Sequence, residues 1–221
     1  MIVDAEALFP GVYRIKGRIA TENMVLGRKV YGEELFAVGG KEYRSWTPYR
    51  SKLSAAISNG MKTMEIREGS NVLYLGASTG TTPSHVSDIV GMRGRVYCVE
   101  ISERSMRDLV GLCQHRGNML PILNDASRPE AYADIVEECD VIYQDVSAKE
   151  QAGILKANSR FLKSGGYAYF VIKSQSIDIS RSPSEVFKAE LESLSGKFDV
   201  VEKIGLEPYD SMHLFVVLKK R

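Results

Sequence analysis

The chain has 221 residues with almost balanced charge, 29 Lys and Arg against 28 Asp and Glu. This length supports one large domain, or one domain with a small appendage. The balance excludes a global basic excess but not a local basic patch, and it indicates that a partner would supply much of the contact with any RNA. No apolar run approaches the ~20 residues of a membrane span, and acidic Asp4 and Glu6 stand where a signal peptide would be basic. Cys98, Cys113 and Cys139 lack metal-ligand spacing. We therefore expect a soluble cytoplasmic protein with reduced thiols, no metal site and no membrane contact.

Residues 1–48 predict a small N-terminal antiparallel β domain. Short β-type runs at residues 12–15, 24–26 and 35–38 are separated by glycine-containing turn signals. A sheet of this size buries too little core to be stable alone, so we expect it to dock on a main domain of residues 49–221.

The connector at residues 43–52 is rich in aromatic and basic side chains. Thr47 and Pro48 predict the cap and first residue of a helix, which Asn59-Gly60 would end. Trp46 and Tyr49 fit two roles equally well: stacking on nucleic-acid bases, or packing the small sheet onto the main domain.

An apolar run at residues 72–75 leads into a turn with Gly76 and Gly80. This pattern indicates a buried parallel strand followed by a ligand-binding turn and a helix N-terminus. Three ligand classes fit the turn: a hydrolase elbow with Ser78 as nucleophile, a dinucleotide fingerprint that lacks two glycines, and an S-adenosylmethionine (SAM) turn.

From residue 70 strands and helices alternate. Strand-like runs end near Leu75, Glu100, Leu123 and Asp145, with helices expected at about 82–90, 103–114, 129–137 and 149–162. A fifth strand at 167–173, a helix at 183–195 and strands at 198–204 and 213–218 follow. The last link is too short for a helical crossover, so the final strand should be antiparallel. This plan predicts an α/β fold of the SAM-dependent methyltransferase class, with a Rossmann-like seven-stranded sheet.

Ionisable residues end four successive strands, where ligands of parallel sheets bind. Glu100 can accept from ribose hydroxyls, Asp125-Ala126 can meet the adenine edge, and Lys173 beside Asp145 can orient or deprotonate a hydroxyl. A hydrolase triad of Ser78, Asp145 or Asp210, and His213 would leave Glu100, Asp125 and Lys173 without roles, and its elbow would lie unusually early in the sheet. We expect helical His85 and His115 to be surface or hydrogen-bonded residues.

Several motifs together resemble the fibrillarin family, in particular its archaeal members, which lack a glycine/arginine-rich tail. The resemblance rests on residues 75–82 (LGASTGTT), 84–88 (SHVSD), 141–146 (VIYQDV) and 207–209 (EPY), strengthened by 50–53 (RSKL) and by 181–187. Two departures stand out: Thr79 replaces the usual asparagine, and Ser147-Ala148 replaces Ala-Gln.

The resemblance implies a SAM-dependent RNA ribose 2′-O-methyltransferase. It would act on rRNA or tRNA chosen by box C/D guide RNA, held by a coiled-coil scaffold protein and a kink-turn-binding ribosomal protein. The implied catalytic residues are Lys52, Asp145, Lys173 and His213. The implied SAM contacts are Gly76, Ala77, Ser78, Gly80, Thr81, Thr82, Glu100, Ile101, Asp125, Ala126, Asp145 and Val146. The alternatives are a stand-alone methyltransferase acting on protein side chains or small molecules, and an inactive assembly subunit.

Overall fold

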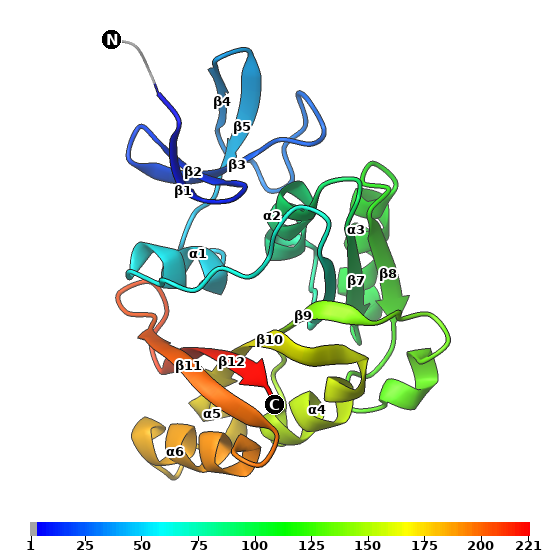
Figure 1. The fold of residues 1–221 in the computed structure, drawn as a ribbon, viewed down its shortest axis with the longest axis vertical. Helices are drawn as coiled ribbons and strands as arrows, with labels where there is room; N and C mark the ends of the chain where they lie inside the picture. The colour runs from blue at the N-terminus through cyan, green and yellow to red at the C-terminus, as the bar shows by residue number, and fades with distance from the viewer. Residues whose placement is uncertain (1–3) are drawn as a thin grey trace.

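The computed structural model describes residues 4–221, which form two β-sheets joined by a connector. The N-terminal sheet is antiparallel, with strand order β1-β2-β3-β5-β4, and lies beside α1 and α2 (Figure 1). Its strands are β1 (Glu6–Phe9), β2 (Val12–Ile15), β3 (Arg18–Glu22), β4 (Leu35–Val38) and β5 (Lys41–Ser45). The prediction of a small antiparallel sheet is confirmed.

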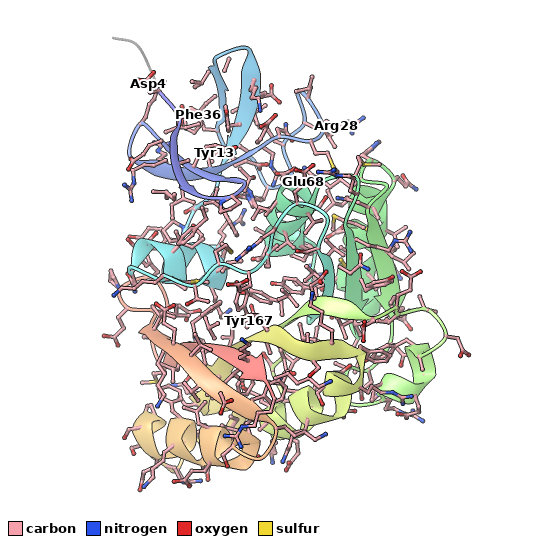
Figure 2. The ribbon with its side chains drawn as sticks, in the orientation of Figure 1. Asp4, Tyr13, Arg28, Phe36, Glu68 and Tyr167 are labelled. Atoms are coloured by element: carbon pink, nitrogen blue, oxygen red, sulfur yellow. The ribbon has the colours of Figure 1, made fainter. Side chains whose placement is uncertain are left out.

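The N-terminal sheet has a small apolar cluster of its own. Tyr13 and Phe36, both labelled in Figure 2, pack there with Tyr43, and the Tyr13 and Tyr43 rings meet edge to face at 5.0 Å. The strand predicted at residues 24–26 is wrong. Asn23 is buried and its side chain accepts from the Val25 N–H, which turns the chain away from β3.

The second sheet has seven strands in the order β11-β12-β10-β9-β6-β7-β8. β6 to β10 are mutually parallel where they pair, and β12 is antiparallel to both β10 and β11, as predicted. The bounds are β6 (Asn71–Leu75), β7 (Arg95–Glu100), β8 (Met119–Leu123), β9 (Cys139–Gln144), β10 (Leu162–Lys173), β11 (Phe198–Gly205) and β12 (His213–Lys220).

Helices cover both faces of this sheet because successive strand residues point to opposite sides. On β6, Tyr74 packs in the cluster that contains α1, α2 and α3, whereas Leu73 and Leu75 pack in the cluster that contains α4 and α6. The helices are α1 (Lys52–Ser58), α2 (Thr81–Val90), α3 (Glu103–Cys113), α4 (Gln151–Asn158), α5 (Ser174–Ile177) and α6 (Pro183–Leu194), with 3₁₀ turns η1 (Pro129–Tyr132) and η2 (Ser159–Phe161).

Some element boundaries differ from the sequence prediction. Helix α1 begins at Lys52 rather than Pro48, because the Ser51 side chain caps it and also accepts from the Thr82 hydroxyl at 2.9 Å. The helix predicted at 129–137 is only the turn η1, and the one at 149–162 is the shorter α4 followed by η2. Strand β10 begins before its predicted start, since a register irregularity between Leu162 and Tyr167 accommodates the glycines. The short helix α5 was not predicted.

A buried ion network joins the N-terminal sheet to α2. Arg44 Nε lies 3.3 Å from carboxylate oxygens of both Glu33 and Asp88, and Arg116 donates to Asp88 at 2.7 Å. All four charged side chains are at most 2% exposed. The predicted domain boundary between residues 48 and 49 falls in the connector just beyond this contact and stays a prediction, because both parts contribute to one hydrophobic cluster.

His85 is fully buried at the same contact and is not a surface residue. Its Nδ1 lies 2.7 Å from the Thr21 hydroxyl, and its Nε2 lies 2.7 Å from the Tyr31 hydroxyl. Burial, followed by the charges of Arg44 and Arg116, holds the pKa of His85 well below its usual value, so the ring is neutral. The expectation of a hydrogen-bonded histidine is confirmed, whereas His115 is exposed.

The two aromatic residues of the connector, Trp46 and Tyr49, differ in burial. Trp46 is 1% exposed and its ring stacks on His85 at 4.7 Å, so its role is packing. Tyr49 is 72% exposed and meets Tyr209 edge to face at 5.2 Å.

No helix within residues 4–221 has both the length and the apolar character to cross a membrane. Cys98, Cys113 and Cys139 are free thiols, as expected.

Candidate active site

The site lies at the carboxyl ends of β6 and β9, where the strand order reverses direction. Gly76 follows β6 with a φ of +83°, and a Cβ on it would lie 2.7 Å from the Asp145 carbonyl oxygen. Only glycine allows both this left-handed conformation and the close approach of the turn to the end of β9. The sequence pattern therefore has a steric cause.

The turn delivers backbone N–H groups to Glu100 at the end of β7. Ser78 has a φ of +50°, and its N–H donates to Glu100 Oε2 at 2.7 Å, while the Ser102 N–H donates to Oε1 at 2.8 Å. Each oxygen of the buried carboxylate keeps lone-pair capacity for a further donor. Glu100 is thus fixed in place and still able to accept two hydroxyls.

A cavity of about 350 Å³ opens beside this turn and fits the size of small-molecule sites. Eight of the residues predicted to contact SAM line it: Gly76, Ser78, Glu100, Ile101, Asp125, Ala126, Asp145 and Val146. Lining residues that were not among the predicted site residues are Val99, Asn124, Ser147, Ala148 and Ile154, of which Ser147 and Ala148 are the departure from the family pattern. Lys173 reaches the same cavity from β10.

The other four predicted contacts lie outside this lining. Ala77 is buried, Gly80 is the left-handed N-cap of α2, and Thr81 lines a different cavity. The Thr82 hydroxyl donates to Ser51 and thereby ties the cofactor turn to α1. Their contact with SAM stays a prediction.

A chain of paired acidic and basic side chains begins at the cavity, which Asp145 and Lys173 line. Lys173 Nζ lies 2.7 Å from Asp145 Oδ1, and Lys52 Nζ lies 3.2 Å from Asp145 Oδ2. Lys52 Nζ is also 3.6 Å from Asp210 Oδ2, and the other oxygen of Asp210 pairs with His213 Nδ1. The four predicted catalytic residues are therefore brought together, with Asp210 as an additional member.

The topology explains this convergence. Lys173 ends β10, which pairs with β9 just before Asp145, and His213 lies directly opposite Lys173 in the antiparallel register of β10 and β12. Lys52 arrives from α1, the helix that Ser51 caps. Residues from four distant parts of the chain thus meet at one sheet edge.

Three polar residues that hold this cluster were not predicted as site residues. Gln151 is fully buried; its Oε1 accepts from the Lys173 N–H at 3.0 Å, and its Nε2 donates to the Ala148 and Lys173 carbonyl groups. Lys173 Nζ donates to the Asp145 carbonyl at 3.0 Å and to the Ser147 hydroxyl at 3.2 Å. Asp210 had a sequence signal, its i, i+3 spacing from His213, but was considered only as a triad acid.

The hydrolase interpretation finds no support in this geometry. Within residues 4–221 the Ser78 hydroxyl forms no hydrogen bond with a histidine, whereas the Ser78 backbone serves Glu100. The cluster instead offers two amines held by carboxylates beside a nucleoside-sized cavity. Such an arrangement can orient a hydroxyl and accept its proton.

The Fibrillarin family model matches residues 3–221, nearly the whole chain. The chain belongs to the fibrillarin family. A family member from Thermococcus gammatolerans, named fibrillarin-like rRNA/tRNA 2′-O-methyltransferase, is 50% identical over 218 residues, which cover 96% of each protein.

Two solved structures extend the family likeness to three dimensions. The Aeropyrum pernix fibrillarin, crystallised with natively bound S-adenosyl-L-methionine, superposes with a TM-score of 0.91 at 44% identity, covering 99% of this chain and 98% of that one. The fibrillarin of a fibrillarin/Nop5p complex superposes with a TM-score of 0.90 at 40% identity, covering 98% and 100%.

Proposed function

We propose that the chain is a SAM-dependent RNA ribose 2′-O-methyltransferase, the catalytic subunit of a box C/D guide-RNA ribonucleoprotein that modifies rRNA and tRNA. The observation that carries this proposal is the cluster of Lys52, Asp145, Lys173, Asp210 and His213 beside the Glu100 cavity. The named activity of the Thermococcus relative and the bound SAM of the Aeropyrum structure support it.

The cavity fits a nucleoside-bearing cofactor. Glu100 would accept the ribose hydroxyls with its two free lone-pair sites, and Asp125 with Ala126 would border the adenine. Gly76 and Ser78 would border the rest of the cofactor from the turn. When bound, SAM supplies an electrophilic methyl group.

Lys173 is the residue that polarises or deprotonates the ribose 2′-hydroxyl. As an ammonium group it donates to the Asp145 carbonyl and the Ser147 hydroxyl and pairs with the Asp145 carboxylate. As an amine it keeps two N–H donors for two of these three partners and has a lone pair for the hydroxyl proton, which it then holds at Nζ. Gln151 fixes its backbone, so the amine is presented in one position.

Asp145 and the remaining polar groups orient this lysine. Asp145 shares its two carboxylate oxygens between Lys173 and Lys52, so neither amine can move freely. Asp210 in turn joins Lys52 to His213, which completes the polar wall around the reacting hydroxyl. Most of the catalysis is then positioning.

The near-neutral charge of the chain suits a subunit that works in a particle. Proposed partners are box C/D guide RNA with its target, a coiled-coil scaffold protein of the kind represented by Nop5p, and, indirectly, a kink-turn-binding ribosomal protein. The fibrillarin/Nop5p complex supports the scaffold. The proposed compartment is the cytoplasm.

The test is transfer of labelled methyl from SAM, with and without guide RNA and partner proteins. Lys173→Ala should reduce guided methylation by about 100-fold or more, the typical size of a general acid–base contribution, while SAM affinity changes little. Lys188→Ala, an exposed α6 lysine paired with Glu192, is the matched control and should retain activity. Full activity of Lys173→Ala would refute the assignment, and guide-independent transfer to protein or small molecules would favour a stand-alone enzyme.

A further inference from the structure

The cavity of about 350 Å³ that Glu100 lines is called the cofactor cavity, and a second concave site lies outside it. It has a volume of about 700 Å³ and is formed by Lys29 on the loop between β3 and β4, by Arg50 in the connector, and by Arg107 on α3. Thr79 and Thr81 of the cofactor turn form part of its wall. Figure 2 shows Arg28, the neighbour of Lys29, on this loop. We call this site the basic cleft; its lining shares no residue with that of the cofactor cavity.

The basic cleft carries uncompensated positive charge. Its lining contains three cations and one carboxylate, Asp108. Within the described part of the chain none of the three cations forms an ion pair, in contrast to the paired lysines of the catalytic cluster. Arg50 is held at the wall, with Nη1 donating to the Tyr31 carbonyl at 3.3 Å and its guanidinium 5.6 Å from the Tyr31 ring centre. Four further guanidinium N–H donors remain available.

The basic cleft is connected to the catalytic cluster by one short segment. Arg50 lines the cleft, Ser51 is anchored to Thr82 at 2.9 Å, and Lys52 reaches Asp145 at 3.2 Å. Two residues of chain span at most about 7 Å, so the Arg50 and Lys52 backbones are separated by no more than roughly the length of one nucleotide.

We propose that the basic cleft binds a backbone phosphate of the target RNA strand next to the nucleotide that is methylated. This inference rests on the proposed function. A ribose that presents its 2′-hydroxyl carries a phosphodiester on the adjacent carbon, so a phosphate necessarily lies close to the reacting oxygen. The planar guanidinium group of arginine can donate two parallel hydrogen bonds to a phosphate. Cations that converge in a concave site can surround a phosphate, whereas the flat surface of a partner protein would not reach into such a site. The phosphate contact positions the strand, whereas the guide RNA selects the nucleotide.

The first test is steady-state methylation of a guide-paired target in the assembled particle, at several salt concentrations. Arg50→Ala and Arg107→Ala should each raise KM for target RNA about tenfold, as expected for the loss of a charged hydrogen bond, with kcat and SAM affinity within about twofold. The slope of log(kcat/KM) against log[salt] should become shallower by about 0.7–0.9 per lost phosphate contact. Arg93→Ala, which replaces an exposed arginine paired with Glu68, is the matched control and should change neither KM for target RNA nor the salt slope.

The second test replaces single target phosphates by uncharged methylphosphonates. One replacement beside the methylated nucleotide should raise KM for target RNA about tenfold with the wild-type protein. It should not raise KM further with Arg50→Ala, because both changes remove the same contact. Independent, additive losses at every phosphate position would overturn the proposal. If the variants instead weaken assembly with the scaffold protein and no methylphosphonate matters, the cleft binds an acidic protein and the proposal is wrong.

These outcomes are distinct from failure of the proposed function. If the wild-type particle methylates RNA and the cleft variants match it at every salt concentration, only the phosphate site is refuted. If the wild-type particle transfers no methyl group to RNA, the proposed function itself fails, and the phosphate inference, which rests on it, fails with it.

Discussion

Within residues 4–221, two clusters of basic side chains and carboxylates differ in burial. The Arg44, Glu33, Asp88 and Arg116 network between the N-terminal sheet and α2 is at most 2% exposed. The side chains of the Lys52, Asp145, Lys173, Asp210 and His213 cluster are 13–29% exposed, and two of them, Asp145 and Lys173, line the cavity beside the cofactor turn. Similar residue types therefore serve two ends: full burial makes the first cluster a structural joint, and partial exposure lets the second meet a substrate.

The difference also lies in what each charge can still bind. Asp88 is enclosed by Arg44, Arg116, the Thr21 hydroxyl and the Met24 N–H. Lys173 also has three partners, the Asp145 carboxylate, the Asp145 carbonyl and the Ser147 hydroxyl, but it lies at the cavity wall, where Glu100 keeps free lone-pair sites. A charged group whose hydrogen-bonding sites are all occupied by protein and buried stabilises the fold, whereas a group with free sites at a cavity can bind a ligand.

The largest expected effect is on stability, at the buried cluster. Asp88→Asn should lower the free energy of unfolding by about 3–5 kcal/mol, because it leaves buried arginine charge uncompensated. Denaturant unfolding followed by circular dichroism measures this loss. A change below about 1 kcal/mol would mean that the joint is not a structural element.

The counterpart at the open cluster is Asp145→Asn. Guided methylation should fall by about 100-fold or more, since Lys173 loses its charged partner, while the free energy of unfolding changes by about 1 kcal/mol or less, as for partly exposed ion pairs. Methylation and unfolding are measured on the same preparation. If Asp145→Asn lost activity only because it unfolded, the second cluster would be structural like the first, and the contrast between the two clusters would be wrong.

A pH series tests the neutral histidine of the buried joint. The pKa of His85 lies well below its usual value of about 6.5 because of burial and the neighbouring arginines. The unfolded chain binds this proton below about pH 6.5 and the folded chain does not, so stability is lost as pH falls from 6.5 toward the folded-state pKa. The slope reaches about 1.4 kcal/mol per pH unit.

The control compares two histidines. His85→Gln should flatten the dependence of unfolding free energy on pH between 6.5 and 5, whereas His115→Gln, at an exposed position, should leave it unchanged. Equal slopes in wild type and His85→Gln would show that the ring is not the source.

The smallest effect is expected at Ser147. Ser147→Ala removes one hydrogen bond to Lys173 Nζ at a partly open position, worth about 0.5–1.5 kcal/mol. The rate of guided methylation should fall about two- to tenfold with an unchanged unfolding midpoint. Ser180→Ala, another exposed loop serine, should have no effect on the rate.

Much of the candidate site could be predicted because parallel strands carry their carboxyl ends to one edge. Glu100, Asp145 and Lys173 each end an apolar run, and Gly76 marks the turn, so their convergence followed from the strand order. Gln151 gave no such signal, because its hydrogen bonds to Lys173 depend on how the start of α4 packs over the end of β10.

Local patterns failed where tertiary contacts override them. The helix expected at 129–137 is only a 3₁₀ turn, in which Tyr132 is buried and its hydroxyl donates to Asn158 at 2.6 Å. The start of α1 likewise depends on Ser51, which Thr82 engages from another part of the chain. Both contacts are invisible to periodicity.

The sequence alone determined the βα order, the antiparallel last strand and the cofactor turn, because hydrophobic periodicity, a short final link and paired glycines act within a few residues of chain. Only the tertiary structure decided that Trp46 is core while Tyr49 is exposed, that Asp210 joins the catalytic cluster, and that three cations converge in the basic cleft. Burial and charge pairing arise from contacts between residues far apart in the chain, so they take effect only when the two sheets and their helices pack together.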